Sequence, residues 1–473
     1  MRGALKARLL TEPARPASVR GFRHAPWLVV GTVCVGAFMG QLDASIVTLA
    51  LPTLRNEFHT GLGAIEWVAL AYLVVLVSMV TVVGRLADMA GRKLLYTYGF
   101  AVFTLGSALC GLAPSLLTLV GARVLQAVGA AMLQANSVAL ITQAMPPRQL
   151  GRGIGVQGAA QALGLALGPA IGGLLIGLGG WRLIFFVNVP AGLLGLVSGW
   201  FLLPRTRELR TGQRFDGWGA ALLMPAVGAL MAALSFGPEE GWLSPPILGL
   251  VGAALALGAG FLARERGLPD PLVRLTMFRS TAFSAGIGSG LLSYLVAFGL
   301  LFVVPFHLEA RGAGPVAAGL QLTVLPAALG LVAPVAGRLG DVLGPRPVTV
   351  LGMLLATAGL LLVAAAPEPP WLLLLELGLI GAGLGAFTPA NNAAIMSNAP
   401  REHRGVAGGI LNLTRGLGTS LGVALTGVVY LLGRPGELVL PALLLAVASL
   451  AAAGLAGLRG SVGEETTVGN EAR

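Results

Sequence analysis

The chain alternates between long apolar runs and short stretches that hold most of its polar and charged residues. Fourteen of the apolar runs reach about 18 or more residues, which is long enough for a helix to cross a bilayer. The pattern therefore predicts an all-α polytopic membrane protein. The predicted transmembrane helices lie near residues 27–51, 64–83, 95–113, 116–141, 153–178, 183–203, 217–237, 247–264, 281–306, 316–336, 347–366, 371–396, 405–431 and 438–457.

Composition agrees with this class of protein. Hydrophobic residues make up 55% of the 473 residues and charged residues only 11%, whereas soluble proteins have about 25% charged residues. A net charge of +11 would favour nucleic acid as the partner of a soluble chain, but most basic residues here fall in short loops. We therefore expect contact with membrane lipid and not with nucleic acid. Cys34 and Cys110 lie inside apolar runs and indicate neither a disulfide nor a metal site.

The distribution of basic residues predicts the orientation. An even number of spans places both chain ends on the same side. With that side inside, the inner tails and loops hold 25 of the 31 Lys and Arg, and the outer loops hold Arg55, Arg182, Arg311 and Arg434. Because Lys and Arg collect on the cytoplasmic side, we expect a multi-pass protein of the cytoplasmic (inner) cell membrane with both termini in the cytoplasm. Residues 1–26 show no convincing cleavage site and are interpreted as a tail before an uncleaved first helix.

A polar stretch between predicted helices 2 and 3 recurs between predicted helices 10 and 11. Its glycines allow a sharp turn, its Asp can cap or pair at a helix end, and its basic residues hold the loop inside. We interpret both copies as tight connections and conclude that the chain has two related halves. The residues that define them are Gly84, Asp88, Gly91, Arg92 and Lys93 in the first copy, and Asp341 and Arg346 in the second.

The repeat predicts two six-helix bundles, formed by helices 1–6 and 9–14, with helices 7 and 8 as a linker without counterpart. Parallel six-helix halves are a transporter plan in which the substrate site lies between them near the midplane. The predicted boundaries are 1–26 for the N-terminal tail, 27–203 for the first bundle, 204–278 for the basic loops and linker helices, 279–457 for the second bundle and 458–473 for the C-terminal tail.

Ionisable residues inside spans are costly and indicate function. Asp43 in helix 1 and Arg123 in helix 4 fall at the same depth, about 6–8 Å outward of the middle at 1.5 Å per residue. They can pair directly or through Gln41 or Gln126. Burial favours the neutral acid and a nearby Arg favours the carboxylate, so Asp43 is our candidate for proton coupling. The alternative is a static, structural ion pair.

Other polar residues within spans admit two interpretations each. Glu376 in helix 12 either binds a proton or a cationic substrate, or is a carboxylate that reaches water. Arg415 in helix 13 either lines the substrate cavity or organises structural hydrogen bonds. The remaining candidates for the cavity, each of which can instead form an interhelical hydrogen bond, are Gln41, Gln126, Gln134, Asn136, Gln157, Gln161, Asn391 and Asn392.

Glycines repeat along one face of predicted helix 5, at Gly164, Gly168 and Gly172, followed by Gly173. Such spacing forms a smooth groove, and Pro169 removes a backbone hydrogen bond and favours a bend. The groove suits two surfaces that seal and slide, and a dimerisation face is the alternative.

Motifs for other chemistry are missing from the sequence. It contains no phosphate-binding Walker loop, no zinc-type His pair and no Gly-x-Ser-x-Gly. The four histidines have no metal-ligand spacing. We therefore expect no enzyme, no metal and no cofactor, and an ion gradient as the energy source.

In these residues the chain resembles the major facilitator superfamily, specifically its fourteen-helix drug:proton antiporter branch. Residues 84–93 resemble the loop motif between helices 2 and 3, although Met89 stands where Arg is usual. Residues 123–131 resemble the helix 4 motif, whose Arg is implicated in proton transfer. Residues 164–173 resemble the antiporter motif, and residues 41–52 and 181–192 resemble the branch's helix 1 motif and its start of helix 6.

The resemblance implies a monomeric proton-coupled antiporter that exports lipophilic, cationic small molecules or drugs by rocker-switch alternating access. Our hypothesis is proton coupling through Asp43, Arg123 and Glu376, with a cytoplasmic latch formed by the loop motif through Asp88 and Arg92. An exporter of a lipid, an antibiotic or another dedicated amphiphile is the alternative on the same fold, and a non-transporting scaffold or receptor is a remote one. An accessory protein outside the membrane is compatible with the sequence, although no docking segment for one is visible.

Overall fold

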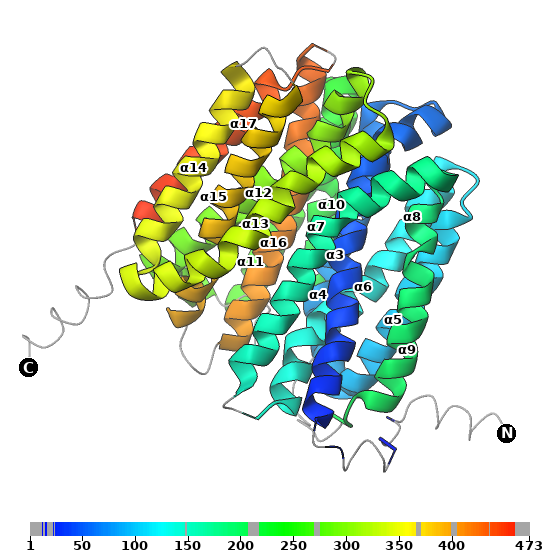
Figure 1. The fold of residues 1–473 in the computed structure, drawn as a ribbon, viewed down its shortest axis with the longest axis vertical. Coiled ribbons are helices and arrows are strands. Elements are labelled where there is room, and N and C mark those ends of the chain that lie inside the picture. Colours follow the sequence, from blue (N-terminus) through cyan, green and yellow to red (C-terminus); the bar gives the residue numbers. More distant parts are fainter. Residues whose placement is uncertain are drawn as a thin grey trace, which may run out of the picture. The chain divides into compact units, whose positions relative to one another are not determined.

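The computed structural model describes residues 12, 15–16, 22, 24–146, 149–206, 217–268, 275–365, 370–398, 404–434 and 436–458. Every regular element in these ranges is helical, as the apolar pattern predicts (Figure 1). The elements are α3 (Ala25–Phe58), α4 (Leu62–Ala90), α5 (Arg92–Gly111), α6 (Leu116–Ala144), α7 (Leu150–Gly179), α8 (Leu183–Phe186), α9 (Asn188–Leu202), α10 (Gly217–Glu240), α11 (Pro245–Gly267), η2 (Leu275–Arg279), α12 (Thr281–Ala310), α13 (Pro315–Leu343), α14 (Pro345–Ala365), α15 (Pro370–Ser397), α16 (Arg404–Leu432) and α17 (Val439–Gly457).

Within the described ranges, 14 helical segments are long and apolar enough to cross a membrane. This confirms the predicted span count and the all-α polytopic class. Several helices extend well beyond the predicted spans, because hydropathy reports the part of a helix that lies in lipid and not the helix ends. The first helix, for example, runs over 34 residues to Phe58.

The two copies of the polar motif form the same structure. Only Gly91, with φ 104°, separates α4 from α5, and only Gly344, with φ 82°, separates α13 from α14. The ten-residue connections expected from the sequence are therefore wrong in length, since most of each motif continues the preceding helix. The sharp glycine turn is present in both copies, and residues with a Cβ rarely adopt such a positive φ.

Predicted helix 6 is divided at Val187 into α8 and α9. Pro190 explains this break, because proline has no N–H to donate to the carbonyl of Phe186, four residues earlier. The interruption places Asn188 at the first residue of α9, where its side chain is buried.

The chain divides into two compact units, residues 1–262 with 313–320, and residues 263–312 with 321–473. In the first unit α3 packs against α7, α5 against α6 and α5 against α9. In the second unit the equivalent partners are α12 with α16, α14 with α15 and α14 with α17. The same pairing order in both units supports the internal repeat that the two motif copies indicate.

The linker helix α10 packs against α4 within the first unit. Ser235 of α10 donates hydrogen bonds to the backbone carbonyl of Gly63 at 2.9 Å and to Glu66 at 3.2 Å. Beside them the rings of Trp67 and Phe236 stack with their centroids 6.0 Å apart. Polar and aromatic contacts therefore both attach this helix to the first bundle.

Candidate functional site

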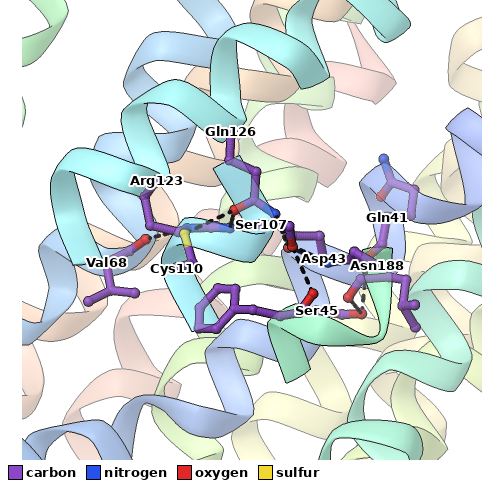
Figure 2. A network of polar contacts seen from close by, with 11 residues as sticks. Gln41, Asp43, Ser45, Val68, Ser107, Cys110, Arg123, Gln126 and Asn188 are labelled. Atoms are coloured by element: carbon purple, nitrogen blue, oxygen red, sulfur yellow. Dashed lines mark hydrogen bonds and ion pairs between the residues drawn. The ribbon is translucent and has the colours of Figure 1, made fainter. Parts of the chain in front are cut away.

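Asp43 of α3 and Arg123 of α6 form a direct ion pair inside the first unit (Figure 2). The Nη1 atom of Arg123 lies 2.6 Å from Oδ2 of Asp43, and the two side chains are 1% and 0% exposed. The helical rise places both residues at one depth, and the structure brings them into contact. A buried pair of this kind is expensive to desolvate, which makes it the strongest candidate for function in the described part of the chain.

Three further polar side chains complete the network around the carboxylate. Gln126 donates through Nε2 to Oδ1 of Asp43 at 2.8 Å, and its Oε1 accepts from Arg123 Nη1 at 2.6 Å. Asn188 donates through Nδ2 to the same Oδ1 at 3.1 Å. Both amides also donate to the hydroxyl of Ser107 at 3.1 Å. The carboxylate therefore accepts from three donors, and hydrogen bonds to the charged form favour it.

Arg123 is fixed by the N-terminal part of α4. Its Nε donates to the backbone carbonyl of Val68 at 2.9 Å, and its Cζ lies 4.1 Å from the centroid of the Tyr72 ring. A cation over an aromatic face in a desolvated position contributes on the order of 2 kcal/mol. α4 thus holds the guanidinium in place independently of Asp43.

Glycine allows the close helix approach on which this network depends. A Cβ added at Gly106 of α5 would lie 2.6 Å from the Cα and the N of Gln126, so only glycine lets α5 and α6 approach this closely. The neighbouring residue, Ser107, then reaches Gln126, and its own hydroxyl donates to the carbonyl of Phe185 at 2.9 Å. The sequence around Gly106 therefore sets the position of the hydroxyl that orients both amides.

Gln41, the other expected bridging residue, does not contact the carboxylate. Its backbone carbonyl accepts from the hydroxyl of Ser45 at 3.1 Å, and its side chain turns away from Asp43 (Figure 2). The bridging role that the sequence left open between two glutamines is thus filled by Gln126.

The glycine face of α7 packs directly on the stretch of α3 that carries Asp43. A Cβ at Gly164 would lie 3.1 Å from the N of Leu42, and one at Gly172 would lie 2.7 Å from Ile46 Cγ1. Gly168 is in contact with Ser45 in the same way. This face, which could have served dimerisation, is covered by α3 of the same unit. Pro169 lies inside the continuous α7, and Gly173 lies beside Val316 in the 313–320 stretch.

The loop motif is tied to the N-terminal tail and to the end of the first bundle. Lys93 is fully buried, its Nζ donates to the carbonyl of Leu203 at 2.8 Å, and its N–H donates to the hydroxyl of Thr206 at 3.1 Å. That hydroxyl donates in turn to the carboxylate of Glu12 at 2.6 Å, and the side chain of Glu12 fills the space above Gly91. Burial also lowers the pKa of the nearby Arg15 guanidinium, because the charged form loses hydration.

The remaining residues of the motif are less informative. The side chains of Asp88 and Asp341, which the sequence singles out as parts of the latch, lie outside the described residues. Gly84 lies within α4, Arg92 is the first residue of α5, and Arg346 is exposed near the start of α14.

The other expected site residues are distributed over both units. Glu376 is fully buried in α15 of the second unit. Asn391 donates to the carbonyl of Gly286 at 3.2 Å, Gln157 donates to Ser137 at 3.0 Å and Asn136 donates to the carbonyl of Met132 at 2.8 Å. Asn391 and Gln157 thus bond between helices, as the sequence allowed, whereas Asn136 bonds to the preceding turn of its own helix. Partly buried positions are held by Gln134, Gln161, Asn392 and Arg415.

Sequence reasoning missed several members of the site. Asn188 lies in the 181–192 stretch that resembles the family's start of helix 6, but its contact with Asp43 depends on the break between α8 and α9. Nothing in the sequence around Ser107 distinguishes it from the other serines of the apolar runs. A further buried carboxylate, Glu66 inside predicted helix 2, is only 1% exposed and accepts from Ser235 of α10. Its place inside a span is the signal that could have identified it. Among the described residues, no cluster of three or more His, Cys, Asp or Glu side chains could hold a metal ion.

In the part of the chain that the structure describes, fourteen helices of membrane-crossing length form two units with one pairing order around a buried ion pair, the plan of a multi-pass membrane transporter. The family model of the Major Facilitator Superfamily matches residues 33–306 and 286–468. The chain belongs to this superfamily, in the fourteen-helix branch of drug-efflux transporters, and members of this superfamily are transporters and not enzymes.

Named relatives resemble the chain over most of its length. A tetracenomycin C resistance and export protein of Streptomyces glaucescens is 36% identical over 87% of this chain and 77% of its own. A riboflavin transporter, RibZ, of Clostridioides difficile is 33% identical over 84% of this chain and 87% of its own length. A multidrug resistance protein, Stp, of Mycobacterium tuberculosis is 35% identical over 84% of this chain and 74% of its own length.

Proposed function

We propose that this transporter is a proton-coupled antiporter that exports lipophilic, cationic small molecules or drugs across the cytoplasmic membrane. The observation that carries the proposal is the fully buried carboxylate of Asp43, 2.6 Å from Arg123. A buried acid beside a permanent cation has two charge states that differ in their interaction with a cationic substrate. A proton gradient then supplies the energy, with no resident cofactor.

The charge balance of the pair explains how exchange would work. With Asp43 ionised, its negative charge cancels the positive charge of Arg123 and the pair is neutral. A proton from the outer aqueous phase converts the carboxylate to the acid, and the pair then carries one positive charge. A positively charged substrate is repelled by the protonated pair and tolerated by the neutral one. Proton binding therefore favours substrate release outside, and proton release inside resets the carrier.

Alternating access requires that the helices around Asp43 move together. The glycine face of α7 gives a smooth contact with α3, and a smooth contact can slide without breaking interdigitated side chains. We propose a rocker-switch motion of this kind, latched at the cytoplasmic face by the loop motif through Asp88 and Arg92. Glu376, buried in the second unit, is proposed as a second site for a proton or a cation.

The substrate class has one competing candidate. The names of two relatives concern drug resistance, which favours lipophilic drugs, but a third is a riboflavin transporter. Export of a dedicated amphiphile, an antibiotic or a lipid is therefore the second candidate. The proposal further includes a monomer in the inner cell membrane with both termini in the cytoplasm and no nucleic acid as a partner, and it is compatible with an accessory protein outside the membrane.

Uptake of a fluorescent lipophilic cation such as ethidium into inverted membrane vesicles tests the proposal. Energised wild-type vesicles should accumulate the cation, an uncoupler should abolish the accumulation, and Asp43→Asn should abolish it while the protein remains folded. Glu57→Gln is the matched control, because that carboxylate is 49% exposed and pairs with Arg182 at 3.6 Å. Normal accumulation by Asp43→Asn would overturn the coupling role. No accumulation by the wild type would favour the dedicated amphiphile.

A further inference from the structure

The hydrogen bonds around Asp43 fit only its ionised form. Oδ2 accepts from Arg123, and Oδ1 accepts from Gln126 and Asn188. An ionised carboxylate only accepts hydrogen bonds, and a protonated one must donate its O–H. If Asp43 takes up a proton, as the proposed function requires, one of its neighbours must therefore change from donor to acceptor.

Most neighbours of the carboxylate cannot make that change. Arg123 has no acceptor atom. The Oε1 of Gln126 already accepts from Arg123 at 2.6 Å, and turning this amide would place its N–H groups against the guanidinium. Ser107 donates its hydroxyl proton to the carbonyl of Phe185 and accepts from both amides. These groups are committed to the bonds they make.

Asn188 differs from them. Its Nδ2 faces two acceptors, Asp43 Oδ1 and Ser107 Oγ, so the assignment of the amide nitrogen to this side follows from the chemistry. Its Oδ1 is buried and accepts no hydrogen bond from any residue that the structure describes. The side chain as a whole is 1% exposed. A buried amide thus keeps an unused acceptor beside the acid.

We propose that Asn188 is the positioning residue that allows Asp43 to be protonated, by a half-turn of its amide about the Cβ–Cγ bond. In the ionised state Nδ2 donates to Asp43. In the protonated state Oδ1 accepts the new O–H of Asp43, and the proton stays bonded to the carboxyl oxygen throughout. The inference rests on proton exchange at Asp43 and adds the group that adapts to it.

Other titratable groups near the carboxylate do not replace this role. The groups that face it from the packed elements are Arg123 of α6, Cys110 of α5 and Tyr72 of α4, all close to the pair. The sequences of α8 and α9 contain no charged residue, and α7 contains only Arg152, in its first turn. The amide of Asn188 is therefore the adaptable partner that these elements supply.

Infrared spectroscopy of the purified, reconstituted full-length protein tests the inference without a substrate. The C=O stretching band of protonated carboxyl groups is recorded as a function of pH. The component of this band that is absent in Asp43→Asn belongs to Asp43. In Asn188→Leu the carboxylate keeps Arg123 and Gln126 as donors, whereas the protonated acid loses its only acceptor and buries an O–H without a partner. The loss is therefore larger for the protonated form, and the pH of half-development should fall, by about one unit or roughly tenfold in proton affinity. A static donor predicts the opposite sign, because its removal would destabilise the carboxylate.

Two further variants make the result decisive. Ser78→Ala removes a buried hydroxyl of α4 that donates to the carbonyl of Val74, so the midpoint should stay within about 0.3 unit, or roughly twofold in affinity. If Asn188→Leu does not fold, Asn188→Ala removes the amide without added bulk and should give the same sign. A rise or no change in the Asn188 variants, or no Asp43 band at any pH, overturns the inference. The vesicle uptake assay tests the proposed function, and its result is independent of the infrared result, which tests the role of Asn188.

Discussion

At the scale of single residues, the burial of Asp43 and Arg123 makes each side chain dependent on the other. Neither reaches water, so the loss of one partner leaves a full charge in an apolar interior. The exposed pair of Arg182 and Glu57, 3.6 Å apart, offers a comparison within the same unit. Exposed ion pairs of this type contribute little, because water replaces the lost partner.

We therefore predict that Arg123→Leu lowers the free energy of unfolding by about 3–5 kcal/mol, since it leaves Asp43 as an unpaired buried charge. The double variant Arg123→Leu/Asp43→Asn should recover part of that loss, because no charge remains. Arg182→Leu should cost only about 0–1 kcal/mol. Equilibrium unfolding in detergent measures all three, and equal losses in the single and double variants would contradict the prediction.

The residue scale also shows what a sequence can and cannot predict about the site. Depth along a helix follows from counting residues, so the meeting of Asp43 and Arg123 could be predicted. Rotation about the helix axis could not, because it depends on packing, and Gln41 and Gln126 were equally good candidates until the helices were placed. Asn188 was hidden for a third reason, since the local break before Pro190 decides where its side chain points.

At the scale of elements, the glycine face of α7 should be sensitive to a single methyl group. A Cβ at Gly168 would meet the hydroxyl of Ser45 and would lie 3.2 Å from the N of Ile46. Gly158 lies on the same helix and would place nothing within 4 Å of an added Cβ. Comparing alanine at the two positions distinguishes the effect of packing against α3 from the effect of alanine's higher helix propensity.

Gly168→Ala should therefore destabilise the protein by about 1–3 kcal/mol through overpacking and reduce vesicle uptake, because α3 carries Asp43. Gly158→Ala should be neutral or stabilising by up to about 1 kcal/mol, since alanine favours a helix. Unfolding and uptake of both variants, measured side by side, check this. An equal loss in both would show that the contact with α3 is not the cause.

A second element-scale prediction concerns the loop motif. Lys93 is one of only two lysines in the chain, the other being Lys6, and its amine is buried on the carbonyl of Leu203. An amine-specific reagent followed by peptide mass spectrometry should therefore label Lys93 slowly in the folded protein. Denatured protein supplies the reference for full reaction.

Removing the hydroxyl beside Lys93 should expose this amine. Thr206→Val loses the hydroxyl that accepts from the backbone N–H of Lys93 and donates to Glu12, and it keeps only the backbone N–H that donates to Glu12. We expect the Lys93 amine to react at least about tenfold faster, the change that corresponds to about 1.4 kcal/mol of lost protection. Thr206→Ser keeps the hydroxyl and should stay protected. Equal labelling in the two variants would show that the hydroxyl of Thr206 does not protect the amine.

At the scale of the whole molecule, hydropathy predicted the number of spans, and the internal repeat predicted equivalent helix pairs in the two units. The tail contact through Glu12 could not be predicted, because nothing in a short polar segment indicates which distant loop it packs against. Helix ends were missed for a related reason, since α4 continues through most of the loop motif.

The even number of spans predicts that both chain ends lie on the same side of the membrane, and the basic residues predict that this side is the cytoplasm. Fluorescent-protein fusions that mature only in the cytoplasm should therefore be bright at either terminus, and alkaline phosphatase fusions at both ends should be inactive. One bright and one dark terminus would require an odd number of spans.

The one-residue connections at Gly91 and Gly344 have a mechanical consequence. A joint of a single residue has two rotatable backbone bonds and no slack, so neither of the helices that it joins can slide along its axis without pulling the other. α4 with α5, and α13 with α14, must therefore move as paired lever arms, and any motion between the arms of a pair must be a change of angle at one glycine.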